Sequence, residues 1–111
     1  MMKILNLTDG NLTSAHISAG VYNLSGPRLW SLYRLLTFSE VPTKLLVNSR
    51  ARRIAQLAKR EKPKFALIGS VPFLIVPLVR ELENVKIVPI YEVVNAGTFV
   101  GFFSTHLGDV L

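Results

Sequence analysis

Short hydrophobic runs alternate along the chain with segments in which apolar residues recur every three or four positions. Phe65–Ile68 is the clearest run. Because it lacks polar alternation and is too short for an independent helix, it predicts a central strand buried on both faces. Lys3–Leu7, Thr43–Val47 and Val85–Val94 predict three further strands. Pro89 lacks a backbone N–H, so we expect the last strand to lie at a sheet edge or to be bulged there.

The first segment with helical spacing follows Ser25-Gly26-Pro27, which has the composition of a helix start, and it ends at Glu40-Val41-Pro42. Its apolar stripe consists of Leu29, Leu32, Tyr33 and Leu36. Trp30 and Phe38 widen this stripe, so we expect both aromatic rings in the core rather than on a base-stacking surface.

Two more helices follow along the chain. Asn48-Ser49 predicts the N-cap of a helix over Arg50–Glu61. Its inward positions are Ala51, Ile54, Ala55 and Ala58, and its outward positions are Arg52, Arg53, Gln56, Lys59 and Arg60. Such a basic face is either solvated or a binding surface. In the third helix, Val71–Glu83, Pro77 either kinks the helix or marks its regular start after an irregular first turn.

Two regions close the assignment of elements. Within Leu12–Leu24, the stretch Ala15–Tyr22 is either a second strand or a loop that folds over the end of the first strand. Asn95-Ala96-Gly97 predicts a turn, after which Thr98–Phe103 returns as an antiparallel edge strand. The exposed aromatic residues of that strand would suit a dimer interface.

The alternation of strands and helices implies right-handed crossovers and a single α/β domain over residues 1–111. We expect a three-layer, Rossmann-like architecture with a mostly parallel sheet of four to five strands. In such a sheet the carboxyl ends of the parallel strands lie at one edge, where open α/β proteins bind their ligands.

Composition narrows the partner classes. Thirteen Lys and Arg residues against seven Asp and Glu residues give a formal charge of +6, which favours nucleotides or nucleic acid as partners unless the chain is merely basic. The absence of cysteine excludes disulfides and thiol nucleophiles, and with only His16 and His106 we expect no metal site. His106 is expected to be structural or exposed. The N-terminus does not resemble a signal peptide and no run is long enough to span a membrane, so we expect a cytoplasmic protein.

Small polar residues follow the predicted strands. The ligand-binding candidates at the carboxyl edge are Thr8, Gly10, Asn11, Asn48, Ser49, Gly69, Ser70 and Asn95, accompanied by Asp9 and Arg50. Backbone N–H groups at such turns favour an anionic ligand rich in phosphate, whereas acidic side chains lining their meeting point would argue against one. Asp9 and His16 form either an acid/base pair or a capping residue and a surface histidine. No glycine-rich dinucleotide fingerprint and no Walker-type loop is present.

The phrases Ala66–Pro72 and Val85–Tyr91, separated by an apolar helix, resemble small ancillary, CARF-like ring nucleases of type III CRISPR antiviral defence. The Arg-His-Pro phrase that some of those families carry after their first strand is replaced here by Thr8-Asp9-Gly10. The resemblance implies a homodimer that binds cyclic oligoadenylate across its two-fold axis. It also implies cleavage by the ribose 2′-hydroxyl, without a metal or another cofactor.

The resemblance further implies roles for individual residues. Gly69 and Ser70 amides would hold phosphate, Arg50 would neutralise charge in the transition state, and His16 or Asp9 would accept a proton. Two alternatives remain open from the residues: a module that binds RNA or DNA through the basic helix face, and a structural or dimerisation protein without catalysis.

Overall fold

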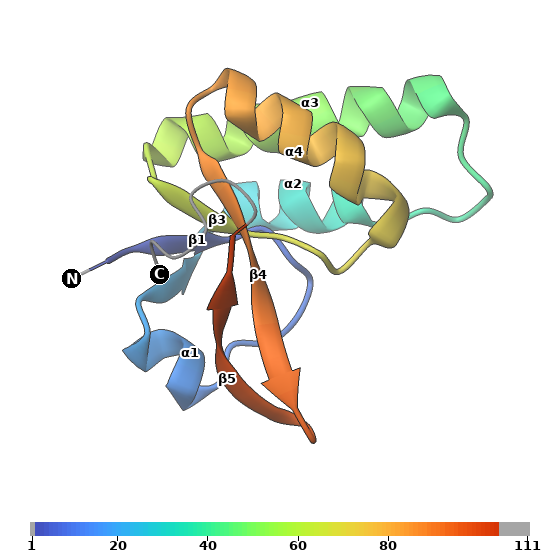
Figure 1. The fold of residues 1–111 in the computed structure, drawn as a ribbon. Coiled ribbons are helices and arrows are strands. Elements are labelled where there is room, and N and C mark those ends of the chain that lie inside the picture. The colour runs from blue at the N-terminus through green and yellow to red at the C-terminus, as the bar shows by residue number, and fades with distance from the viewer. Residues whose placement is uncertain (1, 105–111) are drawn as a thin grey trace.

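A five-stranded sheet with the order β2-β1-β3-β4-β5 organises the computed structural model, which describes residues 2–104 (Figure 1). The strands are β1 Ile4–Asn6, β2 Val21–Asn23, β3 Phe65–Leu67, β4 Val88–Asn95 and β5 Thr98–Phe103. The first four pair in parallel and β5 pairs with β4 antiparallel. This confirms the α/β, Rossmann-like fold class, with a mostly parallel sheet and an antiparallel C-terminal edge strand.

Helices cover the two faces of the sheet unequally. α2 (Pro27–Leu36), α3 (Lys44–Glu61) and α4 (Ile75–Asn84), the last preceded by the 3₁₀ turn η1 (Pro72–Leu74), lie on one face, and the one-turn α1 (Ser14–Ser18) lies on the other (Figure 1). Because successive strand residues point to opposite faces, the core divides into two clusters. The larger one, on the side of α2 to α4, contains Leu5, Ala66 and Ile68, and the smaller one contains Ile4, Phe65 and Ile90.

The connections change direction at β1 and β3. From β1 the chain passes through α1 to β2 on one side, then returns through α2 and α3 to β3 on the other side of β1. Neighbouring strands whose connections leave in opposite directions form a topological switch point, where the loops separate and leave a crevice at the carboxyl edge. In this chain the crevice lies between the loops that follow β1 and β3.

The expected strand Thr43–Val47 is wrong, because these residues enter α3. The Thr43 hydroxyl accepts a hydrogen bond from the Leu46 N–H at 3.1 Å and caps the helix, so the N-cap is Thr43 and not Asn48-Ser49. The apolar run that resembled a buried strand is instead a surface feature, with Leu45 82% exposed. The inward face of Ala51, Ile54, Ala55 and Ala58 is confirmed.

α2 begins at Pro27 as expected but ends at Leu36, earlier than the sequence predicts. Leu32 and Leu36 are buried and Phe38 packs against the larger core cluster. Trp30 is 65% exposed, so the expectation that it belongs to the core is wrong.

Two alternatives are decided by the structure. Pro77 is the third residue of α4, where a backbone N–H has no partner within the helix, and the irregular turn η1 precedes it. The reading with a regular helix start near Pro77 is therefore confirmed. For Ala15–Tyr22 neither the strand nor the loop reading holds over the whole stretch, because its first part lies in the helix α1, which Thr13 caps, and only its last two residues enter β2.

β4 has two parts with different partners. Val88, Pro89 and Ile90 pair with β3, whereas Tyr91 to Asn95 pair with β5 in a hairpin with a register shift at Val93/Val94. The expectation of an edge strand is therefore wrong for β4, and the register shift does not lie at Pro89. Pro89 pairs with β3 and lies ahead of the part registered with β5. The hairpin turns at Ala96 and Gly97, both with positive φ, of 52° and 82° respectively.

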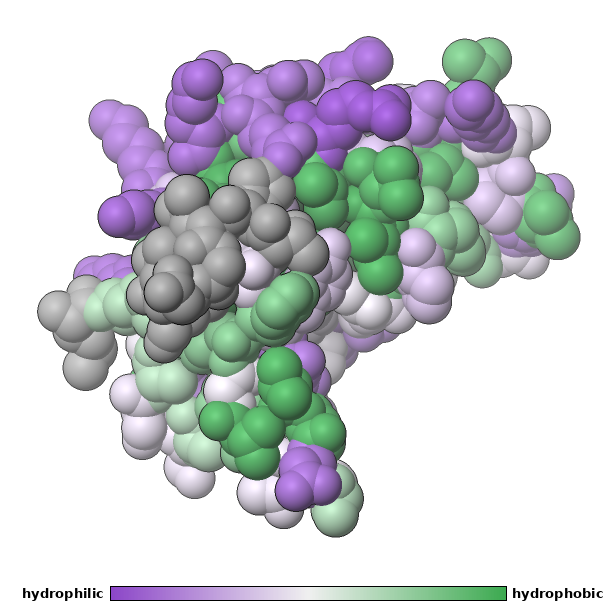
Figure 2. Space-filling view, in the orientation of Figure 1, coloured by the Kyte–Doolittle hydropathy of each residue, from purple (hydrophilic) through white to green (hydrophobic). Residues whose placement is uncertain are grey.

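Surface character follows these layers. Hydrophilic residues gather along the helical side of the molecule, and hydrophobic side chains occupy the projecting hairpin, where Val94 and Val100 are 50% and 59% exposed (Figure 2). Within residues 2–104 no helix combines the length and apolar character required to cross a bilayer.

Candidate functional site

A pocket of about 250 Å³ lies at the switch point. Its walls come from the loop after β1, the loop after β3 and the middle of β4: Thr8, Asp9, Gly10, Leu67, Ile68, Gly69, Ser70, Tyr91 and Glu92. Five of the residues predicted for the carboxyl edge therefore meet in one place: Thr8, Asp9, Gly10, Gly69 and Ser70. We call this cavity the switch-point pocket.

Asn6 organises the first wall of the switch-point pocket. Its side chain is 1% exposed, and its Nδ2 donates to Asn23 Oδ1 at 2.9 Å. Its Oδ1 accepts from the Thr8 backbone N–H at 3.0 Å and from the Thr8 hydroxyl at 2.7 Å. The Gly10 N–H in turn donates to Thr8 Oγ1 at 3.2 Å. A buried amide that uses donors and acceptors in this way fixes the loop conformation.

Glu92 is held in the pocket wall by His16. The His16 side chain is 10% exposed, and its Nε2 lies 2.7 Å from Glu92 Oε2. Phe99 packs on the ring at a centroid distance of 4.5 Å. The Thr13 backbone N–H donates to His16 Nδ1 at 3.1 Å. Because a backbone N–H can only donate, the lone pair is on Nδ1 and the ring proton is on Nε2, directed at Glu92.

The second wall offers donors. No described residue accepts a hydrogen bond from the backbone N–H of Gly69 or Ser70. Gly69 has a φ of +123°, a backbone conformation in which a residue with a side chain would be strained. A Cβ at this position would lie 3.5 Å from the Tyr91 ring. Burial raises the pKa of the Tyr91 phenol above its ordinary value, so this hydroxyl remains protonated and able to donate at neutral pH.

The remaining predicted site residues lie elsewhere. Asn11 is exposed and is not part of the pocket wall, and Asn95 pairs with Thr98 at the far end of the hairpin. Because α3 begins at Lys44, Asn48, Ser49 and Arg50 are inside this helix rather than after a strand. Asn48 lines a hollow of about 650 Å³ between α3 and α4, whose walls are mainly apolar and also include Lys44 and Arg80.

Arg50 has a structural position. Its Nη1 donates to the carbonyl oxygens of Arg34, Leu35 and Thr37, at 3.3 and 3.4 Å for the first two, and its guanidinium lies 4.2 Å above the Phe38 ring. It therefore fastens the end of α2 to α3 and contributes nothing to the switch-point pocket.

The charge of the pocket differs from the expectation. Asp9 and Glu92 both line it, and none of the described residues in its wall is Lys or Arg. The switch-point pocket is therefore acidic, which is the finding that argues against the phosphate-rich ligand expected at this edge. Within residues 2–104 no three His, Asp or Glu side chains are placed to hold a metal ion together.

Three residues of the site were missed in the sequence: Asn6, Tyr91 and Glu92. Asn6 closes a short hydrophobic run, a position at which a buried amide has no distinctive pattern. Tyr91 and Glu92 lie inside one continuous β-rich run, and the sequence gives no sign that its parallel pairing ends at Ile90.

Comparison of the chain with protein-family models, with curated proteins and with solved structures finds no match. The functional argument therefore depends on the geometry of the site.

Proposed function

We propose that the switch-point pocket binds a nucleotide, with its ribose against Asp9 and Glu92 and a phosphate at the N–H groups of Gly69 and Ser70. The observation that carries the proposal is the meeting of two carboxylates with two free backbone donors at a topological switch point. Nucleotide sites of Rossmann-like folds use the same division, in which an acidic side chain accepts from a ribose hydroxyl and backbone amides bind phosphate.

The side chains fit a ligand that carries both hydroxyl groups and charge. Glu92 Oε2 is occupied by His16, and the carboxylate is 43% exposed, which leaves it accessible to a ligand. Thr8, Ser70 and Tyr91 add hydroxyl groups that can donate or accept. Since carboxylates disfavour a second anion nearby, the pocket selects a nucleoside with one adjacent phosphate over a polyphosphate.

Cyclic oligoadenylate, the ligand class implied by the resemblance, fits this proposal if each chain binds one nucleotide unit of the ring. A pocket of about 250 Å³ suits one nucleotide unit per chain, so a ring would span two copies related by a two-fold axis. The homodimer is part of the proposal for that ligand, and a mononucleotide requires no dimer.

Cleavage is a separate hypothesis with a changed assignment. Transfer of the ribose 2′-hydroxyl proton requires an acceptor, and the Nδ1 lone pair of His16 already accepts a hydrogen bond from Thr13. Glu92 is the accessible acceptor beside it, so His16 would position the base and Glu92 would receive the proton. A Glu92→Asp variant, which keeps the negative charge proposed to hold the ribose but draws the carboxylate away from the 2′-hydroxyl, should bind the ring and open it more slowly.

Thermal unfolding with adenosine, AMP, cyclic oligoadenylate and inorganic phosphate tests the binding proposal. A ligand at a hundredfold its dissociation constant adds about 2.7 kcal/mol to the free energy of unfolding, which is a clear shift in melting temperature. We expect shifts with the nucleotides, loss of the shift in Glu92→Gln, and retention of the shift in Glu40→Gln, which removes the same charge from an exposed residue outside the pocket wall. Absence of a shift with every nucleoside and nucleotide, or an equal loss in both variants, refutes the proposal.

A further inference from the structure

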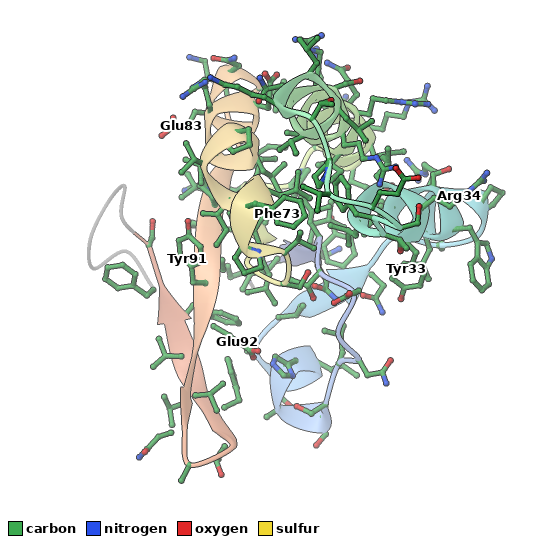
Figure 3. The ribbon with its side chains drawn as sticks, turned by 90° about the vertical axis from the view of Figure 1, so that its right-hand side faces the viewer. Tyr33, Arg34, Phe73, Glu83, Tyr91 and Glu92 are labelled. Atoms are coloured by element: carbon green, nitrogen blue, oxygen red, sulfur yellow. The ribbon has the colours of Figure 1, made fainter. Side chains whose placement is uncertain are left out.

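A second recessed surface lies between α2 and α3 on the helical side of the molecule. Two adjoining hollows of about 350 and 580 Å³ share Arg34 and Arg50. Ser31, Leu35, Leu46, Ser49 and Arg53 complete the first, and Trp30, Tyr33, Thr37 and Ser39 complete the second. We call this surface the α2–α3 groove, and it lies apart from the switch-point pocket, as the positions of Tyr33 and Arg34 relative to Tyr91 and Glu92 show (Figure 3).

The groove exposes aromatic rings that the core does not use. Trp30 is 65% exposed, and Tyr33, one helical turn later, meets it edge to face at a centroid distance of 6.1 Å. Arg34 follows Trp30 by four residues and so projects from the same side of α2. A largely exposed tryptophan beside an arginine is costly to leave in water and is typical of a surface on which planar rings stack.

The charge of the groove has one sign. Arg34, Arg50 and Arg53 line it, and none of the described residues in its walls is Asp or Glu. Outside the groove, Glu61 at the end of α3 forms an ion pair with Arg28. The basic potential therefore faces the solvent at this place, where an anionic chain would find guanidinium donors for its phosphates.

The walls of the groove are held at both ends. The Arg28–Glu61 ion pair joins the start of α2 to the end of α3, and Arg50 joins the last carbonyl groups of α2 to α3. Binding therefore requires little reorganisation of the helices, which reduces its entropic cost.

We propose that the α2–α3 groove binds single-stranded nucleic acid, with a base stacked on Trp30 and phosphates paired with Arg34 and Arg53. Interleaved aromatic and cationic side chains are the common chemistry of single-strand recognition, because every base has a face that can stack and every nucleotide carries a phosphate. The inference is independent of the nucleotide proposed for the switch-point pocket, since it uses none of its residues.

The chain carries its own probe for this test. Trp30 is its single tryptophan, so a base stacked on it should quench the intrinsic fluorescence. Titrations with oligouridylate and oligothymidylate separate RNA from DNA. The logarithm of affinity should fall with the logarithm of salt by about 0.7 for each phosphate contacted. Inorganic polyphosphate and polyglutamate, which carry charge without bases, should leave the fluorescence unchanged.

Variants identify the groove as the site, with anisotropy of a labelled oligonucleotide as the readout. Trp30→Ala should weaken binding by about tenfold or more, and Arg34→Gln with Arg53→Gln should weaken it further and reduce the salt slope. Lys59→Gln with Arg60→Gln removes the same charge from exposed positions near the end of α3 and should cost less than about threefold. The proposal would be overturned if the Arg34/Arg53 and Lys59/Arg60 double variants lost the same affinity. Quenching by polyglutamate, or the absence of quenching by both oligonucleotides at low salt, would also overturn it.

Discussion

The switch-point pocket and the α2–α3 groove differ in the elements that form them and in the sign of their charge. The pocket lies at the ends of strands, is lined by Asp9 and Glu92, and is shaped by buried hydrogen bonds around Asn6. The groove lies between two helices, is lined by arginines, and presents an exposed tryptophan. A net charge of +6 therefore describes the helical surface and not the edge of the sheet where ligands of this fold class usually bind. The lesson is that a formal charge predicts a kind of partner without predicting its place.

The largest expected difference concerns stability. Asn6→Leu removes the partners of Asn23 and of the Thr8 N–H and leaves polar groups of the pocket loop unsatisfied. We expect the free energy of unfolding in urea to fall by about 2–4 kcal/mol. Ser31→Ala in the groove should change it by less than about 0.5 kcal/mol, because a surface substitution disturbs no buried network. Similar changes in the free energy of unfolding for the two variants would show that the pocket does not depend on a buried hydrogen-bond network.

The second-largest expected difference is in the salt dependence of ligand affinity at the two regions. With two phosphates paired to Arg34 and Arg53 in the α2–α3 groove, a fourfold rise in salt should lower oligonucleotide affinity by about sevenfold. Adenosine carries no charge, so its affinity for the switch-point pocket should change by less than about twofold under the same conditions. The two titrations can be followed by anisotropy and by calorimetry. A steep salt dependence for adenosine would show that the electrostatic contrast between the regions is wrong.

The Thr13→Ala variant tests whether the cap of α1 supports nucleotide binding in the switch-point pocket. The Thr13 hydroxyl caps α1 by accepting from the His16 backbone N–H and also lies 2.8 Å from His16 Nδ1, so it helps to orient the ring that holds Glu92. We expect a loss of about 1 kcal/mol in stability together with severalfold weaker nucleotide binding. Thr43→Ala is the matched control, because Thr43 caps α3 through the same kind of bond and lines no wall of the pocket. It should lose stability and keep nucleotide affinity, and a parallel loss of affinity in both would contradict the coupling.

The smallest expected effect is a pH dependence at Tyr91. Burial raises the pKa of its phenol in the folded chain above its ordinary value of about 10. The folded state thus holds this proton more tightly, so the associated stability is complete below pH 10 and is lost as pH rises through the folded pKa. Tyr91→Phe should lose less stability than the wild type across that alkaline range, with denaturation at several pH values as the measurement. Equal slopes would indicate that Tyr91 is solvated in the folded chain.

Much of the framework was predictable from local pattern. Phe65–Ile68 is uniformly apolar and becomes the central strand β3, and Asn95-Ala96-Gly97 becomes the hairpin turn. The failure at Thr43–Val47 has a physical reason. A run of three apolar residues is compatible with either a strand or the exposed side of a helix, and the Thr43 cap together with the long following helix determines the outcome.

The site was predictable only in part. Thr8, Asp9, Gly10, Gly69 and Ser70 follow the first and central strands, so their meeting follows from topology. Glu92 and His16 are separated by 76 positions in the chain, and their contact depends on the hairpin continuing beyond the parallel part of β4. Trp30 was assigned to the core because helical periodicity alone does not reveal where the apolar stripe ends.

Ala96 gives the hairpin one further property. A residue with a side chain pays about 1–2 kcal/mol for the left-handed backbone that this turn imposes on it, whereas asparagine tolerates it readily. The backbone of the hairpin tip is therefore strained at Ala96. We expect the amide protons of the tip to exchange with solvent before those nearer the sheet. We therefore expect the part of β4 that carries Glu92 to open from the hairpin tip inward while the helices stay folded.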